Sequence, residues 1–319
     1  MYEITSSYEN KDVFTFDNTH ARDKANVLAS REYYRQIWDD FEPKSKLPGV
    51  HFTSYPGAPG PKLWTLRADL TEGGLKAYAA EKLIAEVEED TLVYCAPRQG
   101  HAPAAIAALA KLYDKRVVFF LPASKRPSDH QAALAAHPHV ELRFLRIAAM
   151  PVLNKYAREF AESKGYKYLS FGLTGTPLVT AGMVHLADEV AREMGREPGA
   201  IYCAVSTGTM IRGLQIGWPN AKAFGVAVAR NIKMGEKGEA ELVSATIPFL
   251  KRDKIADDMP FPTTAAYDAK AWKMFMETDI DNSIFINVGA DECITRDLAK
   301  VDIDAIDSYR EWGDMRDLT

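Results

Sequence analysis

A lysine in an unusual position is the first candidate for chemistry. Lys76 closes the segment DLTEGGLK, just after a double glycine and one leucine, at the start of a predicted helix over 76–89. The positive end of a helix disfavours an ammonium, and burial would lower the pKa of the amine further. An amine held near neutrality is what Schiff-base chemistry requires. The alternative interpretation is a solvent-facing lysine in the first helical turn.

A second candidate is the turn Ser206-Thr207-Gly208-Thr209, between the apolar run AIYCAV and the segment MIRGLQIG. A turn rich in glycine and hydroxyl residues that opens a helix after a buried strand presents backbone N–H groups and the helix dipole to an anion. The turn therefore predicts a phosphate site, and the alternative is an ordinary capped turn between a strand and a helix.

Three further segments carry polar residues at the ends of predicted elements. Tyr267 and Asp268 stand at a probable helix start, where an acid is often only a partner for the helix dipole. Gln99 and His101 stand in the loop 97–103 after a buried strand, where open α/β sheets bind ligands. The glycine turn NVGA, 287–290, follows the last apolar strand.

Composition limits the classes of function. The 319 residues include 39 Lys and Arg against 44 Asp and Glu, and no basic run is present, which argues against a nucleic-acid partner. We expect neither a membrane span nor a signal peptide, so the expected compartment is the cytoplasm. The three cysteines, Cys95, Cys203 and Cys293, show no spacing typical of a zinc site or a disulfide framework, and no metal is expected.

Strands and helices alternate from Leu63 onward, which predicts βαβ units and a mainly parallel sheet. The first 60 residues are less regular: 26–40 reads as a helix and the Pro- and Gly-rich stretch 51–62 as a loop. The stretch 231–262 breaks the alternation and reads as an insertion or mobile loop. The predicted strands are 63–70, 91–96, 116–123, 140–145, 166–172, 200–205, 222–229 and 283–290.

These segments, taken in order, resemble the fold-type II pyridoxal-phosphate enzymes, in particular the branch of ACC deaminase and D-cysteine desulfhydrase. The resemblance runs from about Leu63 to Ala290. It places the Schiff-base lysine at Lys76 and the substrate loop at Gln99, Gly100 and His101. It also places the phosphate loop at Ser206, Thr207, Gly208 and Thr209, and it matches AAYDAK to a Tyr-acid-Gly-Lys segment of the deaminase.

The sequence departs from the family pattern in three places. The family's loop usually reads Ser-Asn-His, so Gln99 stands where an asparagine contacts the ring hydroxyl. The phosphate loop lacks one glycine. Val288 and Ala290 replace the Thr and Gly of the desulfhydrases, whose hydroxyl faces the pyridine nitrogen. The resemblance to the deaminase instead assigns that nitrogen to Asp268, whose carboxylate would keep it protonated and make the ring a stronger electron sink.

The resemblance implies an α/β fold of two domains with twisted, mainly parallel sheets flanked by helices. We expect a large domain of 1–91 plus 181–319 and a small inserted domain of 92–180, with pyridoxal 5′-phosphate between them. The expected function is a lyase or deaminase acting on a small amino acid through a carbanion (quinonoid) intermediate, with Lys76 moving protons and Tyr267 facing the substrate. A homodimer is expected from the family.

Two alternatives stay open at the level of sequence. The altered loop at 99–101 would hold the substrate carboxylate differently, and that orientation decides which bond breaks. A decarboxylase or racemase acting on a bulkier amino acid is therefore the first alternative. The second is a binding module that has lost catalysis, which the missing asparagine favours and the retention of both Lys76 and Asp268 opposes.

Overall fold

The computed structural model describes residues 24–53, 61–124, 126–146, 149–229, 232 and 234–306. The chain divides into two compact units, which are Met1–Lys82 with Thr174–Asp291 and Leu83–Leu173 with Glu292–Thr319. The inserted domain was predicted over 92–180, whereas the corresponding segment of the second unit is Leu83–Leu173. The sequence also assigned the last residues to the larger domain. Each unit is described by itself below.

The first unit contains a six-stranded sheet in which only the edge strand β1 is antiparallel to its neighbour, β2. The other neighbouring strands are parallel, as the alternation of elements predicts. Parallel strands buried on both faces read as continuous apolar runs, which explains why AIYCAV and SIFIN were recognisable in the sequence. The sheet order is β1 (Gly49–Thr53), β2 (Leu63–Arg67), β10 (Ser283–Asn287), β7 (Ala200–Val205), β8 (Lys222–Ala227) and β9 (Glu241–Ser244).

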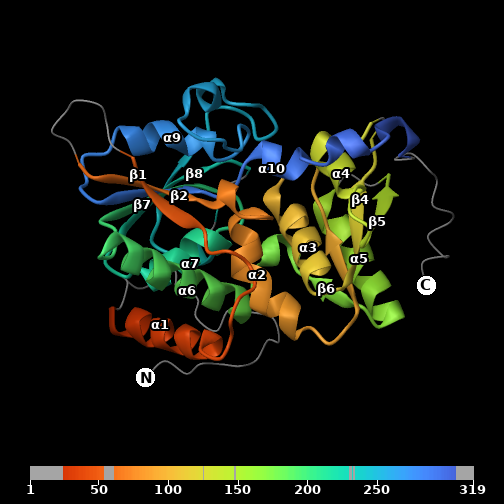
Figure 1. Cartoon of the computed structure of the whole chain (residues 1–319), viewed down its shortest axis with the longest axis horizontal. Coiled ribbons are helices and arrows are strands. Elements are labelled where there is room, and N and C mark those ends of the chain that lie inside the picture. Colours follow the sequence, from red (N-terminus) through yellow and green to blue (C-terminus); the bar gives the residue numbers. More distant parts are fainter. Residues whose placement is uncertain are drawn as a thin grey trace. The chain divides into compact units, whose positions relative to one another are not determined.

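Helices cover both faces of this sheet. Figure 1 shows α1 (Lys24–Trp38), α6 (Pro177–Met194) and α7 (Thr209–Gly217) below it, and α9 (Ala269–Met276) above it. The aromatic side chains of α9 pack on the apolar face of the strands, with the Trp272 and Phe285 ring centroids 5.1 Å apart. On the other side, Trp38 and Ile216 belong to a second buried cluster formed by the three lower helices.

Two glycines allow the helices that support the site to approach closely. A Cβ at Gly213 of α7 would lie 2.6 Å from the Met183 Cβ of α6. A Cβ at Gly182 of α6 would lie 2.3 Å from the backbone oxygen of Ala79, which belongs to α2 (Gly74–Glu86). Side chains at these positions would force the helices apart, so α2 and α7 are held in place by direct contact with α6.

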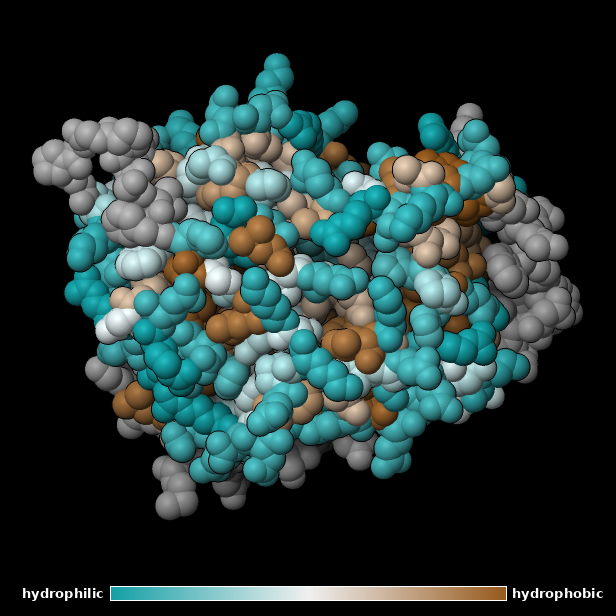
Figure 2. Space-filling model, viewed as in Figure 1, coloured by the Kyte–Doolittle hydropathy of each residue, from teal (hydrophilic) through white to brown (hydrophobic). Residues whose placement is uncertain are grey.

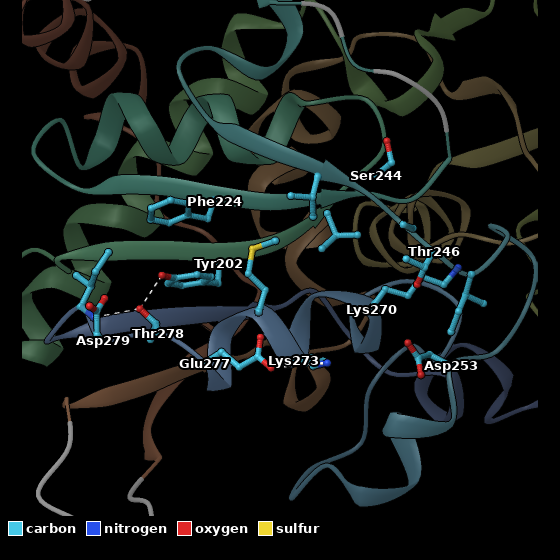
Figure 3. A pocket seen from close by; sticks show the side chains of 16 residues that line it. Tyr202, Phe224, Ser244, Thr246, Asp253, Lys270, Lys273, Glu277, Thr278 and Asp279 are labelled. Atoms are coloured by element: carbon cyan, nitrogen blue, oxygen red, sulfur yellow. Dashed lines mark hydrogen bonds and ion pairs between the residues drawn. The ribbon is translucent and has the colours of Figure 1, made fainter.

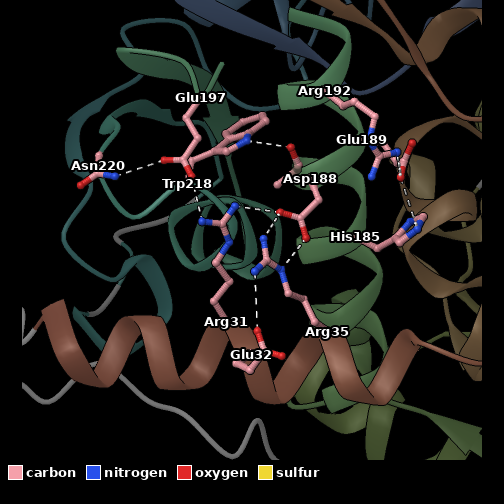
Figure 4. A network of polar contacts seen from close by, with 11 residues as sticks. Arg31, Glu32, Arg35, His185, Asp188, Glu189, Arg192, Glu197, Trp218 and Asn220 are labelled. Carbon is pink, nitrogen blue, oxygen red and sulfur yellow. Dashed lines mark hydrogen bonds and ion pairs between the residues drawn. The ribbon is translucent and has the colours of Figure 1, made fainter. Parts of the chain in front are cut away.

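A polar network joins α1 to α6 (Figure 4). Asp188 of α6 accepts hydrogen bonds from Arg31 at 2.7 Å and from Arg35 at 2.8 and 2.7 Å. Arg31 also pairs with Glu197 at 2.8 Å. Hydrogen bonds between a guanidinium group and a carboxylate are charge-assisted and therefore strong, and the Asp188 carboxylate accepts from two such groups. The network therefore fixes the helix α1, predicted over 26–40, against the unit's core.

The second unit has a four-stranded parallel sheet in the order β5-β4-β3-β6. The helix α5 packs on it through Leu153 and Phe160, and ends at Gly165, a left-handed cap with φ +67°. The elements are β3 (Thr91–Cys95), β4 (Arg116–Pro122), β5 (Val140–Leu145), β6 (Lys167–Leu169), α3 (His101–Leu112), α4 (Asp129–Leu134) and α5 (Met150–Lys164), while α10 (Asp291–Thr295) begins at the boundary between the units.

Two stretches differ from the sequence-based prediction. The predicted loop 51–62 begins as strand, because 49–53 pairs with β2 as β1; residues 54–60 lie outside the described residues. The predicted insertion 231–262 contains α8 (Met234–Lys237) and the edge strand β9, which pairs in parallel with β8. Both strands lie at the edges of the sheet, where a strand has a neighbouring strand on one side only. Edge strands are less covered than central ones, and the sequences of β1 and β9 contain no continuous apolar run.

Hydrophilic residues dominate the face in Figure 2, and apolar residues are scattered among them in small groups. Across the described ranges, no helix is long and apolar enough to cross a membrane. Those ranges also contain no group of three acidic, His or Cys residues placed to hold a metal ion. Cys95 and Cys203 are buried free thiols within apolar strands.

Candidate active site

Three parallel strands of the first unit end at one edge of its sheet. β2 and β7 both pair with β10, with Arg67 opposite Asn287 at the end of the ladder. The segments that follow these strands are the start of α2, the turn at Val288 and the loop 206–209. Ligands of open α/β sheets bind beyond the carboxyl ends of the strands, so this edge is where chemistry is expected.

Lys76 lies in the first turn of α2, two residues after the double glycine. Gly73 and Gly74 have φ values of +74° and +68°, a conformation that glycine adopts without strain, and they turn the chain into the helix. The residue keeps part of its surface accessible, while protein surrounds its amine. Burial lowers the pKa of Lys76 from 10.5 to about 8. The lysine therefore has the lowered basicity that the sequence predicted.

Asp268 is the most unusual carboxylate of the unit. It is 0% exposed, and its Oδ2 accepts one hydrogen bond, from the Val288 N–H at 3.2 Å. Its Oδ1 is buried and has no hydrogen-bond partner. Burial raises the pKa of Asp268 well above its usual value, and the charges of Asp291 and Asp69 raise it further. Asp268 is the N-cap residue of α9, but its side chain makes no capping hydrogen bond to the helix.

The peptide of Val288 connects the lysine helix to Asp268. The Leu75 N–H, next to Lys76, donates to the Val288 carbonyl at 2.9 Å, while the Val288 N–H donates to Asp268. Because the N–H and the C=O of Val288 are both hydrogen-bonded, the start of α2 and the Asp268 carboxyl group are held at a defined spacing. The sequence identified Val288 only as a position that lacks a hydroxyl.

Tyr267 connects Asp268 to the phosphate loop. The backbone N–H of Ser206 donates a hydrogen bond to its phenol oxygen. Burial raises the pKa of Tyr267 well above 10, and the nearby Asp268 and Cys203 add to the shift. The phenol therefore keeps its proton at neutral pH. The structure thus brings Tyr267, Asp268 and Ser206 together, as the sequence predicted for one site.

The loop 206–209 has the geometry of an anion site at a helix start. Gly208 is the N-cap of α7 in the left-handed conformation, with φ +79°, and a Cβ there would lie 1.9 Å from the Glu236 backbone oxygen. Glycine is therefore required at this position. The Thr207 and Thr209 hydroxyls lie 3.2 Å apart. Thr209 is buried at the first position of the helix.

The predicted substrate loop belongs to the second unit. Gly100 has φ +146°, and its N–H donates to the His130 Nδ1 at 3.3 Å. His101 is buried as the first residue of α3, and the Gln99 Oε1 is buried with no hydrogen-bond partner. These residues follow the carboxyl end of β3, as predicted. Their role toward a substrate stays a prediction.

Sequence reasoning missed a group of buried polar residues beside Asp268. The Asn287 Nδ2 donates to Asp69 at 2.7 Å, and its Oδ1 accepts from the Thr263 hydroxyl at 2.8 Å. Asp69 in turn accepts two hydrogen bonds from Arg67, at 2.8 and 2.6 Å. The sequence did contain a signal for this group: Asn287 ends the apolar run SIFIN, and Asp69 lies two residues after the end of β2.

A cavity of about 580 Å³ lies elsewhere in the first unit, between α9 and the strands β8 and β9 (Figure 3). The stacked rings of Tyr202 and Phe224 form part of its wall, with centroids 5.1 Å apart. Lys76, Asp268 and the loop 206–209 do not line it. The cavity is therefore separate from the residues that the sequence singled out.

The residues of the carboxyl edge fit pyridoxal phosphate. An amine of lowered pKa suits attachment to the aldehyde, and a helix start with a glycine and three hydroxyl residues suits the phosphate. The orphaned Oδ1 of Asp268 suits the ring nitrogen, because a buried carboxylate oxygen without a donor is costly until a donor arrives. Each end of the cofactor thus has a chemically matched group in one unit.

Solved structures of similar fold are enzymes of amino-acid chemistry. An "ACC deaminase homologue" is 18% identical, with a TM-score of 0.64 over 84% of this chain and 97% of that chain. Threonine deaminase isoform 2 from Solanum lycopersicum is 15% identical, with a TM-score of 0.63 over 93% of each chain. Maize serine racemase is 14% identical, with a TM-score of 0.61 over 82% of this chain and 94% of that chain. At these identities the likeness concerns the fold.

The family comparison covers most of the chain. No curated protein matches the sequence. The family described as "Pyridoxal-phosphate dependent enzyme" matches residues 48–294, which include the lysine, the phosphate loop and Asp268. The fold, the residues at the carboxyl edge and this match agree, and the chain belongs to the family of pyridoxal-phosphate dependent enzymes of fold type II, whose cofactor is pyridoxal 5′-phosphate.

Proposed function

We propose that this enzyme is a lyase or deaminase that acts on a small amino acid. The observation that carries the proposal is the arrangement of Lys76 and Asp268 on the two sides of the Val288 peptide, with the Asp268 Oδ1 buried and lacking a donor. When bound, pyridoxal phosphate withdraws electrons from the α-carbon of an amino acid joined to it. An acid at the ring nitrogen strengthens that withdrawal.

Lys76 has two roles in this proposal. Its Nζ would hold the cofactor at the aldehyde carbon, and its amine would move a proton at the α-carbon of the substrate or at the neighbouring carbon. A pKa of about 8 suits both roles, because a useful fraction of the amine is neutral near neutral pH and the protonated form is still a competent acid. The surrounding protein, which lowers the pKa, also excludes water from the amine.

In this proposal, the other residues hold the cofactor and orient the substrate. The N–H groups and hydroxyls at 206–209 bind the phosphate, aided by the positive end of α7. Asp268 holds a proton at the ring nitrogen. Tyr267 is fixed by the Ser206 N–H and keeps its phenolic proton, so it can donate a hydrogen bond toward the substrate. We assign Gln99 and His101 to the substrate carboxylate, in keeping with the loop they occupy.

The racemase alternative is supported by the fold likeness to serine racemase and to an aspartate racemase. Racemisation needs two groups that exchange protons on opposite faces of the α-carbon. Lys76 is one such group, but a phenol whose pKa lies well above 10 is a poor base at neutral pH. This difference between Lys76 and Tyr267 favours elimination or deamination over racemisation.

The first experiment tests cofactor attachment. Purified protein is incubated with pyridoxal phosphate and reduced with borohydride, and the labelled peptide is identified by mass spectrometry. We expect the label on Lys76. A label on another lysine, such as Lys82 on the same helix, would overturn the assignment, and the absence of any label would favour the binding-module alternative.

The second experiment separates the reactions. The loaded enzyme is offered ACC, D-cysteine, L- and D-serine, L- and D-threonine and diaminopropionate, with three readouts: released ammonia, released carbon dioxide and exchange of the α-hydrogen in heavy water. Ammonia release from one of these supports the proposal. Interconversion of enantiomers without ammonia supports the racemase, and carbon dioxide release supports the decarboxylase.

A further inference from the structure

The cavity between α9 and the strands β8 and β9 takes no part in the proposed reaction (Figure 3). Its volume of about 580 Å³ lies within the range of about 300–1,000 Å³ in which proteins bind small molecules. Its lining comes from the first unit alone: strands β7, β8 and β9, the segment after β9, and α9 with the residues that follow it. The cavity is therefore built within one compact unit, and its side chains determine what it can bind.

An aromatic wall forms one end of the cavity (Figure 3). The Tyr202 ring of β7 stacks on the Phe224 ring of β8, with centroids 5.1 Å apart and an interplanar angle of 18°. The Tyr202 hydroxyl donates to the Thr278 Oγ1 at 2.6 Å, and the centroid of the Phe275 ring lies 5.7 Å from that of Tyr202. Because Tyr202 is buried and held by these three neighbours, the wall is formed before a ligand binds, which lowers the cost of binding.

Both lysines that line the cavity already have partners in the protein. The Lys273 Nζ lies 3.7 Å from the Glu277 Oε1, one turn further along α9. The Lys270 Nζ donates to the carbonyl oxygens of Pro248 and Phe249, at 2.9 and 3.2 Å. An anionic ligand would therefore compete with existing partners at either ammonium group.

The acids of the lining outnumber the lysines, since Asp253, Glu277 and Asp279 line the cavity beside Lys270 and Lys273. Asp253 acts on Lys270 by charge and Glu277 pairs with Lys273, which leaves Asp279. Across the described residues, no lysine or arginine side chain pairs with Asp279. Asp279 is exposed and lies at the same end of the cavity as the aromatic wall (Figure 3).

A second acid, Glu241 at the start of β9, adds to the charge at this end. Burial raises the pKa of the Tyr202 phenol, and the charges of Asp279 and Glu241 raise it further. The aromatic end therefore combines an apolar surface with a negative potential. Such a combination recognises organic cations, because acids and the faces of aromatic rings both attract positive charge.

We propose that this cavity binds a small organic cation, an ammonium compound with an apolar or aromatic body, at a site separate from the carboxyl edge. Its charged group lies toward Asp279, and its body lies against Phe224 and Met274. A neutral ligand leaves Asp279 without a cation, and an anion meets a negative potential. The inference does not depend on the reaction proposed above, and its failure would leave that proposal unaffected.

The test uses the cofactor-loaded protein and benzyltrimethylammonium, a quaternary ion that cannot attach to the cofactor aldehyde. Ligand-observed NMR titrations give its affinity beside those of N,N-dimethylbenzamide, which is neutral, and 3-phenylpropionate, which is an anion. We expect saturable binding of the cation, binding of the neutral amide that is weaker by about threefold or more, and no binding of the anion. The cation should bind cofactor-free protein equally well, because the residues of the carboxyl edge do not line the cavity.

Two variants locate the site. Asp279→Asn removes the charge at an exposed position and should weaken cation binding by about three- to fivefold. Phe224→Leu removes the ring and should weaken cation binding by a similar factor. Asp258→Asn is the matched control, since Asp258 is an exposed acid of the same unit that does not line the cavity. Added salt should weaken cation binding more in the wild type than in Asp279→Asn, because salt screens exposed charges.

Three results would overturn the inference: no saturable binding of the cation, equal affinities for the cation and the neutral amide, or an affinity that neither Asp279→Asn nor Phe224→Leu changes. Cation binding that is lost when pyridoxal phosphate is loaded would place the cation at the carboxyl edge, and it would overturn the inference as well.

Discussion

Two buried or half-buried aspartates of the first unit, Asp188 and Asp268, meet opposite electrostatic surroundings. For Asp188, burial raises the pKa, but the hydrogen bonds from Arg35 and Arg31 outweigh it and leave the pKa below its usual value (Figure 4). For Asp268, burial is opposed by one backbone N–H, and the pKa lies well above its usual value. A carboxylate with its own cations stabilises the fold, whereas one without them stores free energy that a ligand can recover.

The same contrast applies to cations. Arg31 finds two carboxylates within 2.8 Å, while burial alone lowers the pKa of Lys76 to about 8. Perturbed groups of this kind gather at functional sites because catalysis needs groups that can change charge. The N-terminal network and the carboxyl edge therefore divide the unit's charged residues into a structural set and a chemical set. The comparison predicts that changes in the chemical set mainly lower turnover, whereas changes in the structural set mainly lower the free energy of unfolding.

The largest expected effect follows the loss of the Lys76 amine. Lys76→Met should lower turnover by about 10³-fold or more, because both attachment and proton transfer are lost. It should also remove a pH dependence of stability. The unfolded state binds more protons than the fold between pH 8 and 10.5, so wild-type stability rises with pH across that window. Urea unfolding of cofactor-free protein at several pH values measures this, and an unchanged rise in the variant would contradict it.

Next in size is an added charge at the phosphate loop. Thr207→Glu places a carboxylate beside the bound phosphate, and an unpaired charge in a partly desolvated site costs on the order of 3–5 kcal/mol. Pyridoxal phosphate affinity should fall by about 10²- to 10⁴-fold, with Thr207→Gln as the neutral control of similar size. Equal affinities in the two variants, measured by fluorescence titration, would show that the loop only caps the helix.

A smaller effect on turnover, but a gain in stability, is expected for Asp268→Asn. Loss of a charge-assisted hydrogen bond is worth about 1.5–3 kcal/mol, or roughly 10- to 100-fold in turnover. The cofactor-free variant should be more stable than the wild type above about pH 4, because the unfolded carboxyl ionises there while the folded one with its raised pKa resists, so wild-type stability falls as pH rises. Near-normal turnover together with normal cofactor content would place the ring partner elsewhere.

The smallest effect is expected in the structural set. Asp188→Asn should lower the free energy of unfolding by about 1–2 kcal/mol and leave turnover unchanged. The wild-type contribution is present above the unfolded pKa of about 3.9 and is lost as pH falls through the lower folded pKa, so the two proteins should converge in acid. Unfolding curves at pH 7 and pH 3 test this. If Asp188→Asn loses turnover while it is still fully folded, the division into a structural and a chemical set is wrong.

Much of the fold could be predicted because strands buried on both faces leave continuous apolar runs. The strand Val140–Leu145 has the predicted bounds, and AIYCAV was recognised as β7. The strand β9 was not, because its four residues Glu-Leu-Val-Ser are mostly exposed at the sheet edge. Its pairing depends on the backbone of β8, which leaves no apolar pattern in the local sequence.

The site was predictable where one residue's local context is distinctive. Lys76 follows two glycines, and Gly208 lies in a hydroxyl-rich turn, so both could be proposed from a few neighbouring letters. The contact between Asn287 and Asp69 joins residues 218 positions apart, and neither is unusual in its own segment. Such contacts arise only when β10 pairs with β2, so the sequence predicted the reacting groups better than the residues that hold them.

The Val288 bridge also has a consequence for how this enzyme can change over generations. Its two hydrogen bonds use the main chain, so most single substitutions at position 288 leave both intact. Proline there would remove the donor to Asp268, and an inserted or deleted residue in the turn would shift the register. Side chains in this turn can therefore change while the main-chain bonds that set the spacing between amine and acid are kept.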